Sequence, residues 1–400
     1  MFCTRSAFRR MSHLASRFVG RGDVHVVDPA VDLRYVFEDT ERLRRTLEER
    51  RNSASITELK EKYFAWWEKY QVWKGASGLP KEALSAAKRA MREEQDGLLG
   101  ALALPNFVHE VGKTERQMLK KSRRSVRIQT MSLEHQQYLV QKGHMRFDNG
   151  TGVVFLQGYP VLLQNSLKVQ LLEMFSGAVL VSPSCFARAA VLEAVNVPLE
   201  GFLRFTDGSD SFPATFLVGH SIFSHVSLFI RSQFSEGKNQ WPITIQSTGV
   251  AYHAKFAMQR RAADLAYARQ RTKHCVLSLA LDDEQMDGFA TESVAKIGAL
   301  LDEGLLLDLK IRRVLGKELR NYESQAVVIE DNGMQLARIS RISDYISRRL
   351  NVVTDSGAFL RMVYVETDVD RVLGRLVDGL VEGKDIPKSL RDFVRAEDLA

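Results

Sequence analysis

The chain has few cysteines, few prolines and no long uninterrupted apolar segment. Only three of its 400 residues are cysteines. Cys185 and Cys275 are too far apart to indicate a disulfide framework or a metal-ligand pair, so we expect no metal site and expect both to be small core residues. No apolar run is long enough to cross a bilayer, which predicts no membrane association through a spanning helix.

Acidic residues are absent from the first 22 positions. This segment contains five arginines, which are Arg5, Arg9, Arg10, Arg17 and Arg21. They supply five of the seven net positive charges, so the remaining chain is nearly balanced. Aromatic residues spaced among arginine and serine are typical of a mitochondrial transit peptide, and a disordered basic tail is the alternative. We predict a presequence over residues 1–22 and a location in the mitochondrial matrix.

Helical periodicity follows in three segments. Residues 37–51 form the first, with Asp39 and Thr40 available as caps. Residues 56–74 form the second, and the third begins at Pro80 and runs to about Leu104. The last two are expected to form an antiparallel hairpin. The aromatic face of the second favours helix packing over stacking on nucleobases.

The rest of the chain alternates strand-like segments with helices. Residues 160–175 are expected to be a helix, and residues 178–183 a strand that ends in proline. The apolar content of 45% can fill a large core. This pattern predicts an α+β domain built on an antiparallel sheet.

Residues 337–352, ARISRISDYISRRLNV, resemble the strand and helix that read SCSNCTDFQARRLNI in seryl-tRNA synthetases. Residues 104–110 resemble the "lPN-hE" junction of that family, and residues 386–393 its terminal "iPevLrpY". The resemblance implies a class II aminoacyl-tRNA synthetase core, with an antiparallel sheet flanked by helices, over residues 113–400. It implies an N-terminal domain with a shortened helical-hairpin arm over residues 23–112. Residues 160–183 correspond to motif 1, the principal dimer contact of this class.

The ATP-binding positions depart from the family pattern. Residues 241–255 resemble motif 2, "lPikyagistcFRqE", but His253 stands in place of the arginine and Lys255 in place of the glutamate. A mostly neutral imidazole cannot replace a permanent bidentate cation at a phosphate. Motif 3 has lost both glycines in residues 362–373, and three acids there, Glu366, Asp368 and Asp370, would repel a triphosphate. Arg371 is the candidate for the motif 3 arginine.

The serine-binding positions are also changed. The resemblance places His220 where the family has threonine, and Ile222 and Cys275 where it has glutamates. An isoleucine cannot accept a hydrogen bond, so polar groups of serine would stay unpaired there. We interpret the adenylation site as inactive, with no catalytic residues and no cofactor.

A basic run follows the predicted arm. It holds seven basic side chains against Glu115 alone, and these are Lys113, Arg116, Lys120, Lys121, Arg123, Arg124 and Arg127. Charge runs usually mark a solvated face, but this density makes them candidates for phosphate contacts.

The chain is most similar to a catalytically degenerate mitochondrial branch of the family, known from insects. That resemblance implies a protein that dimerises with the genuine mitochondrial seryl-tRNA synthetase, or with itself, and supports mitochondrial translation. Binding of tRNA or mitochondrial DNA through the basic run is a second hypothesis. The alternative is an active, divergent serine–tRNA ligase that uses ATP.

Overall fold

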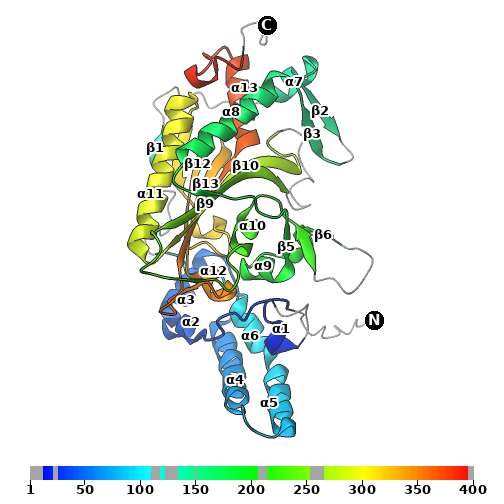
Figure 1. The fold of residues 1–400 in the computed structure, drawn as a ribbon, viewed down its shortest axis with the longest axis vertical. Helices are drawn as coiled ribbons and strands as arrows, with labels where there is room; N and C mark the ends of the chain where they lie inside the picture. The colour runs from blue at the N-terminus through cyan, green and yellow to red at the C-terminus, as the bar shows by residue number, and fades with distance from the viewer. Residues whose placement is uncertain are drawn as a thin grey trace.

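The computed structural model describes residues 12–20, 26–109, 118–121, 134–148, 151–205, 214–252 and 265–394. A helical N-terminal part and a larger part built on a sheet lie end to end along the long axis (Figure 1). In the described residues, no helix is long and apolar enough to span a membrane.

The N-terminal part is mainly helical. Its elements are α1 (Ser16–Val19), α2 (Arg34–Glu38), α3 (Thr40–Glu49), α4 (Ile56–Gly75), α5 (Lys81–Glu93) and α6 (Gln95–Leu102). The expected helix over 37–51 is divided into α2 and α3 because Asp39 caps α3, where its carboxylate accepts a hydrogen bond from the Arg42 amide at 2.8 Å. The expected third helix is divided at Glu94 into α5 and α6. A Cβ on Gly97 of α6 would lie 2.1 Å from the Lys62 carbonyl oxygen, so glycine permits the close contact with α4.

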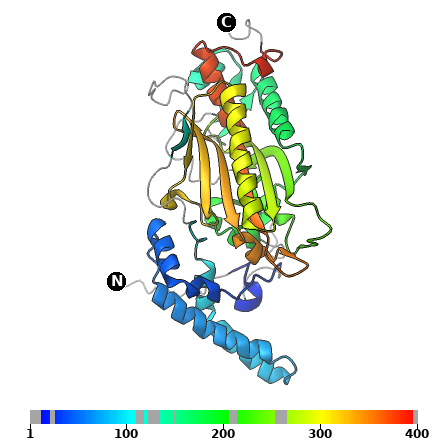
Figure 2. The same cartoon turned by 90° about the vertical axis from the view of Figure 1, so that its left-hand side faces the viewer.

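The hairpin of α4 and α5 projects away from the sheet (Figure 2). The aromatic face of α4 packs inward, and the side chains of Tyr63 and Trp66 are fully buried. The Tyr63 hydroxyl donates to the Val31 carbonyl and accepts from the Leu33 amide, both at 2.8 Å. For these two residues, helix packing is confirmed.

In the described residues, eight strands form the main sheet. Their order across the sheet is β1 (Met118–Lys121), β11 (Leu309–Arg313), β12 (Gln325–Asp331), β13 (Met334–Ser343), β15 (Arg361–Asp368), β10 (Gln270–Ala280), β9 (Ile243–Tyr252) and β4 (Val179–Leu180). All neighbours are antiparallel except β4 and β9, which are parallel. The expected α+β architecture with an antiparallel sheet is confirmed, although the strand expected over 178–183 contains only the two residues of β4.

Small sheets surround the main one. They pair β2 (Met145–Asp148) with β3 (Val153–Leu156), β5 (Phe186–Arg188) and β6 (Leu203–Phe205) with β7 (Thr215–Leu217), and β8 (Gln233–Phe234) with β14 (Val353–Thr354).

Helices cover both faces of the main sheet, which explains why its central strand β10 is buried. One core contains Val276 and side chains from α7 (Glu134–Gln141), α8 (Tyr159–Met174), α11 (Asp283–Ala299) and α13 (Val369–Val381). The opposite core contains Leu277 and side chains from α9 (Ala189–Ala194), α10 (Ile222–Ser227) and α12 (Tyr345–Leu350). Successive β10 residues alternate between the two cores, as strand geometry requires. Figure 2 shows α11, in yellow, lying over one face of the sheet.

Two of the segments that carry the sequence resemblance pack against each other. Residues 337–352 form the end of β13 and α12, the implied strand and helix. The Asn106 side-chain amide donates to the Ile342 carbonyl at 2.7 Å, and the Tyr345 hydroxyl donates to the Leu104 carbonyl at 2.7 Å. These bonds join the helical N-terminal part to the sheet.

Candidate functional site

A cleft of about 410 Å³ opens beside strands β9, β10 and β15. Six acidic or basic residues line it, and they are Arg271, Lys273, Arg320, Glu366, Asp368 and Arg371. Three of them, Glu366, Asp368 and Arg371, are residues that the sequence resemblance places in the ATP-binding motif 3. The β10–β15 register sets Lys273 opposite Asp368 and Cys275 opposite Glu366, which brings these positions together.

Glu366 is paired with two cations inside the cleft. Its carboxylate lies 2.9 Å from the Lys273 ammonium and 3.3 Å from the Arg320 guanidinium. The side chains of Lys273 and Glu366 are 7% and 11% exposed. Water screens such a buried pair weakly, so the attraction is much stronger than at the surface. The sequence suggested that the Glu366 carboxylate would repel phosphate. In the structure this carboxylate neutralises the charges of Lys273 and Arg320.

Asp368 has the same role at the start of α13. Its carboxylate lies 3.3 Å from the Arg271 guanidinium and 3.5 Å from that of Arg371, and it caps α13 by accepting from the Arg371 amide at 3.1 Å. The Arg371 guanidinium also donates to the backbone carbonyls of Ala266 and Gln335, at 3.1 and 3.0 Å. Burial lowers the pKa of Arg371. Its donors are thus directed to the chain itself.

Asp370 is not among the residues that line the cleft. Its carboxylate accepts from the Gln164 side-chain amide at 2.6 Å and from the Thr272 backbone amide at 2.7 Å. Burial raises the pKa of this carboxyl to about 7. Asp370 therefore connects α8, β10 and α13 and is not directed at a phosphate site.

His220, one of the three positions expected to bind serine, belongs to an internal hydrogen-bond network with Ser247 and His225. His225 Nδ1 lies 2.8 Å from the Ser221 carbonyl, which fixes Nδ1 as the donor and leaves Nε2 to accept from the Ser247 hydroxyl at 3.2 Å. His220 Nδ1 then donates to Ser247 Oγ at 2.9 Å. Burial lowers the pKa of His225 to about 4 and also lowers that of His220, so both rings are neutral near pH 7. Ile222 is buried in the apolar core at the start of α10.

Cys275 is fully buried, as expected for a small core residue. The Tyr364 hydroxyl donates to its sulfur at 3.0 Å, and burial raises the pKa of the thiol to about 12. A protonated thiol at this position is not an anionic partner for an ammonium group. Among the described residues, no group of three histidine, cysteine, aspartate or glutamate side chains could hold a metal ion.

Several predicted positions lie outside the described residues. His253 and Lys255 follow the end of β9 at Tyr252 and are not described. The same applies to five members of the basic run, which are Lys113, Arg116, Arg123, Arg124 and Arg127. The backbones of Lys120 and Lys121 form part of the edge strand β1, which pairs with β11.

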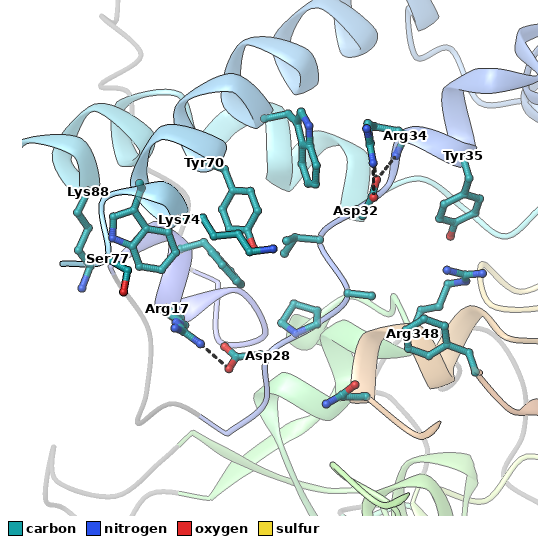
Figure 3. Close-up of a pocket in the computed structure, with 18 of the residues that line it drawn as sticks. Arg17, Asp28, Asp32, Arg34, Tyr35, Tyr70, Lys74, Ser77, Lys88 and Arg348 are labelled. Carbon is teal, nitrogen blue, oxygen red and sulfur yellow. Dashed lines mark hydrogen bonds and ion pairs between the residues drawn. The ribbon is translucent and has the colours of Figure 1, made fainter. Parts of the chain in front are cut away.

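A larger cavity of about 1,070 Å³ lies between the hairpin and α12 (Figure 3). Ion pairs line it, with Arg17 2.7 Å from Asp28 and Arg34 2.7 Å from Asp32. The Arg348 guanidinium lies over the rings of Tyr35 and Phe359, at 4.5 and 4.7 Å from their centroids. No sequence pattern predicted this cavity, because segments that are distant in the chain assemble it.

Four apolar side chains on α8 and on the edge strand β4 are exposed. On the outer face of α8, Leu162 and Val169 are about half exposed. In the neighbouring edge strand β4, Val179 and Leu180 are 62% and 65% exposed. We call these four residues the edge patch. All four lie in the segment that resembles motif 1.

No protein-family model matches the chain, and no curated protein sequence matches it. Solved structures do. The cytoplasmic serine–tRNA ligase of Naegleria fowleri, in complex with AMP, aligns with a TM-score of 0.71 at 18% identity, over 91% of this chain and 96% of that one. The seryl-tRNA synthetase of Pyrococcus horikoshii, complexed with ATP, also aligns with a TM-score of 0.71, at 14% identity, over 90% and 97%.

A prolyl-tRNA synthetase aligns over a smaller region. The Giardia lamblia enzyme, in complex with prolyl-adenylate, has a TM-score of 0.57 at 12% identity and covers 64% of this chain. The similarity to the two seryl-tRNA synthetases extends instead over nine tenths of this chain or more. The chain therefore has the fold of a class II aminoacyl-tRNA synthetase, in the full-length arrangement of seryl-tRNA synthetases.

Proposed function

We propose that this protein is a degenerate member of the seryl-tRNA synthetase family that has lost adenylation activity, like the mitochondrial branch found in insects. It acts in the mitochondrial matrix by dimerising with the genuine mitochondrial seryl-tRNA synthetase and so supports mitochondrial translation. One observation carries the loss of activity: the cations of the cleft are bound by the chain's own carboxylates and carbonyls.

Adenylation needs cations that are free to stabilise charge on the phosphates of ATP. Here Lys273 and Arg320 are held by Glu366, and the Arg371 donors are directed to backbone carbonyls. A triphosphate would have to displace these partners and then meet two carboxylates. Repulsion between those carboxylates and the phosphates would oppose binding.

The positions expected to bind serine offer no anionic partner for the substrate ammonium. The substrate ammonium requires an anionic partner in a buried site, because an unpaired charge there is costly. Ile222 presents an alkyl group and Cys275 a protonated thiol at the two positions concerned. Discrimination for serine would therefore be weak even if ATP entered.

The edge patch supports the dimerisation proposal. An exposed apolar edge strand is a ready site for association with another chain. A stable interface buries about 800 Å² on each partner, so the patch would form only its centre. A partner that binds only the folded protein stabilises it by mass action, which explains how a protein without catalysis would support an enzyme.

The catalytic proposal is tested by serine-dependent exchange of pyrophosphate into ATP. We expect no exchange above background from the purified chain, whereas the genuine mitochondrial enzyme, assayed in parallel, exchanges readily. The double variant His253→Arg and Lys255→Glu should also remain inactive, because Ile222 and the cleft ion pairs are unchanged. Exchange by the wild-type chain would establish the alternative, an active divergent ligase.

The dimerisation proposal is tested by co-expressing the chain with the mitochondrial seryl-tRNA synthetase. Native mass spectrometry of the purified material should give the mass of one copy of each. Finding only the two separate homodimers would reject the mixed assembly.

Nucleic-acid binding is a second candidate function. The basic run places seven cationic side chains within fifteen residues. Such a density suits contacts with the phosphates of tRNA or mitochondrial DNA, without reading their bases.

A further inference from the structure

The N-terminal segment Ser12–Gly20 is built into the fold. The Glu193 carboxylate on α9 accepts three hydrogen bonds from it, at 2.8 Å from the Ser12 hydroxyl, 3.0 Å from the His13 amide and 2.8 Å from the Leu14 amide. The Ser12 oxygen also accepts from the Ala15 amide at 3.1 Å, just before α1. Hydrogen bonds to a charged acceptor are stronger than neutral ones, so Glu193 holds the N-terminal segment strongly against the sheet-based part.

The same segment inserts side chains into two different cores. Leu14 is 2% exposed and belongs to the core that contains α9, α10 and α12. Phe18 is 4% exposed and belongs to the core of the hairpin. Its ring is edge-on to Trp66, Tyr70 and Trp73, with centroid distances of 6.1, 5.9 and 6.4 Å. Edge-to-face contacts of this kind add to the stabilisation from burial.

The end of the segment fits closely against the hairpin. Gly20 has φ +74°, and a Cβ there would lie 2.4 Å from Cζ of Arg92 on α5. The left-handed backbone conformation favours glycine at this position, whereas the Arg92 guanidinium is the end of a flexible side chain that could move. Arg17 pairs with Asp28 at 2.7 Å and lies 5.5 Å from the Trp73 ring centroid. Figure 3 shows this ion pair at the larger cavity, whose wall includes Arg17 and Phe18.

We infer that residues 12–20 are a strap that ties the hairpin to the sheet-based part and that the mature protein retains. The leader that accompanies the proposed mitochondrial function is then removed on the N-terminal side of Ser12, and not near residue 22. Loss of the strap would remove Phe18 from its three aromatic partners and leave the Glu193 carboxylate without its three donors. A cut near residue 22 would thus uncover a surface that the fold has buried.

The strap itself is tested in the full chain by the rate of trypsin cleavage after Arg17 under native conditions. Glu193→Ala should increase this rate at least tenfold, because the three bonds that hold the segment are lost. Glu200→Ala is the matched control, since it removes a glutamate carboxylate close in the sequence that is exposed. Equal rates in both variants would overturn the strap. If Glu193→Ala folds poorly, Phe18→Leu should still raise the rate without removing the anchor.

The processing site is tested by the intact mass of the protein isolated from its own cells. A chain that begins at Ser12 or earlier agrees with a retained strap. A chain that still begins at Met1 also retains the strap, and would count only against the proposed mitochondrial leader. A chain that begins after Ser12 would overturn the inference.

Discussion

The Lys273 ammonium and the Glu366 carboxylate lie 2.9 Å apart on the paired strands β10 and β15, inside the cleft where the sequence resemblance places ATP and serine. The two side chains are only 7% and 11% exposed, so removing the carboxylate would leave the Lys273 charge buried without it. Mutation of Glu366 therefore tests, through the free energy of unfolding, whether this ion pair is a structural contact.

Glu366→Gln should destabilise the protein. The amide leaves the Lys273 charge buried without its carboxylate, and removing one partner of a buried pair costs about 3 kcal/mol in unfolding free energy. Urea denaturation followed by far-UV circular dichroism measures this difference. Glu292→Gln is the control, because its pair with Lys296 is 40% to 57% exposed and should contribute less than about 1 kcal/mol. Equal effects of the two changes would show that the cleft pair is not a stabilising contact.

The buried His225 should make stability fall in mild acid. Burial lowers its pKa from 6.5 to about 4, so between these values the unfolded chain binds a proton that the folded chain does not. This contribution is present above pH 6.5 and is lost as the pH falls toward 4, at up to about 1.4 kcal/mol per pH unit. His225→Gln should reduce the slope of unfolding free energy against pH by about one proton. Asp370, whose pKa is raised to about 7, acts in the opposite direction but equally in both proteins, so it cancels in the comparison.

The elements of the fold follow from the sequence where local signals are strong. The period of apolar residues predicted α4 within one residue at its end, and Asp39 marked a helix cap. The resemblance of residues 337–352 predicted a strand followed by a helix. Both predictions depend on residues close together in the chain, which is why they succeed.

The cleft and the strap depend on distant contacts. Glu366 and Asp368 were expected to face a triphosphate as unpaired acids, because the sequence does not reveal that β10 supplies Arg271 and Lys273 opposite them. Leu14 and Phe18 fit an amphipathic leader equally well, since Glu193 lies about 180 residues away from them in the chain. Only the contacts between segments that are distant in the sequence distinguish paired from unpaired acids and a packed segment from a leader.

Charges in the edge patch should prevent assembly. In Val179→Asp with Leu180→Asp, two carboxylates would be buried at the centre of the interface, where unpaired charges strongly oppose association. Native mass spectrometry should then give the mass of a single chain, and circular dichroism should be unchanged because both side chains are exposed in the protomer. Val72→Asp is the control, because Val72 is 62% exposed on the hairpin, away from the patch. An assembly that survives the double change would place the interface elsewhere.

Neutralising the basic run should weaken nucleic-acid binding in a salt-dependent way. Each phosphate contact releases condensed counterions, so the logarithm of affinity falls with the logarithm of salt by about 0.7 per contact for a single strand and about 0.9 for a duplex. Replacing Lys120, Lys121, Arg123 and Arg124 with glutamine should therefore reduce the magnitude of this salt dependence by about 3 if all four side chains contact phosphate. Fluorescence anisotropy with a labelled tRNA and a labelled DNA duplex, each at several salt concentrations, measures it.

The matched control removes the same charge from dispersed positions, which are Lys238, Lys317, Lys388 and Arg391. Both variants have the same net charge, so a general electrostatic attraction would weaken equally in the two. A slope that changes only in the basic-run variant locates the phosphate contacts there, and the probe that it weakens more identifies the preferred nucleic acid. Identical slopes in both variants would show that the run is a solvated face, and the protein would then act through its edge patch alone.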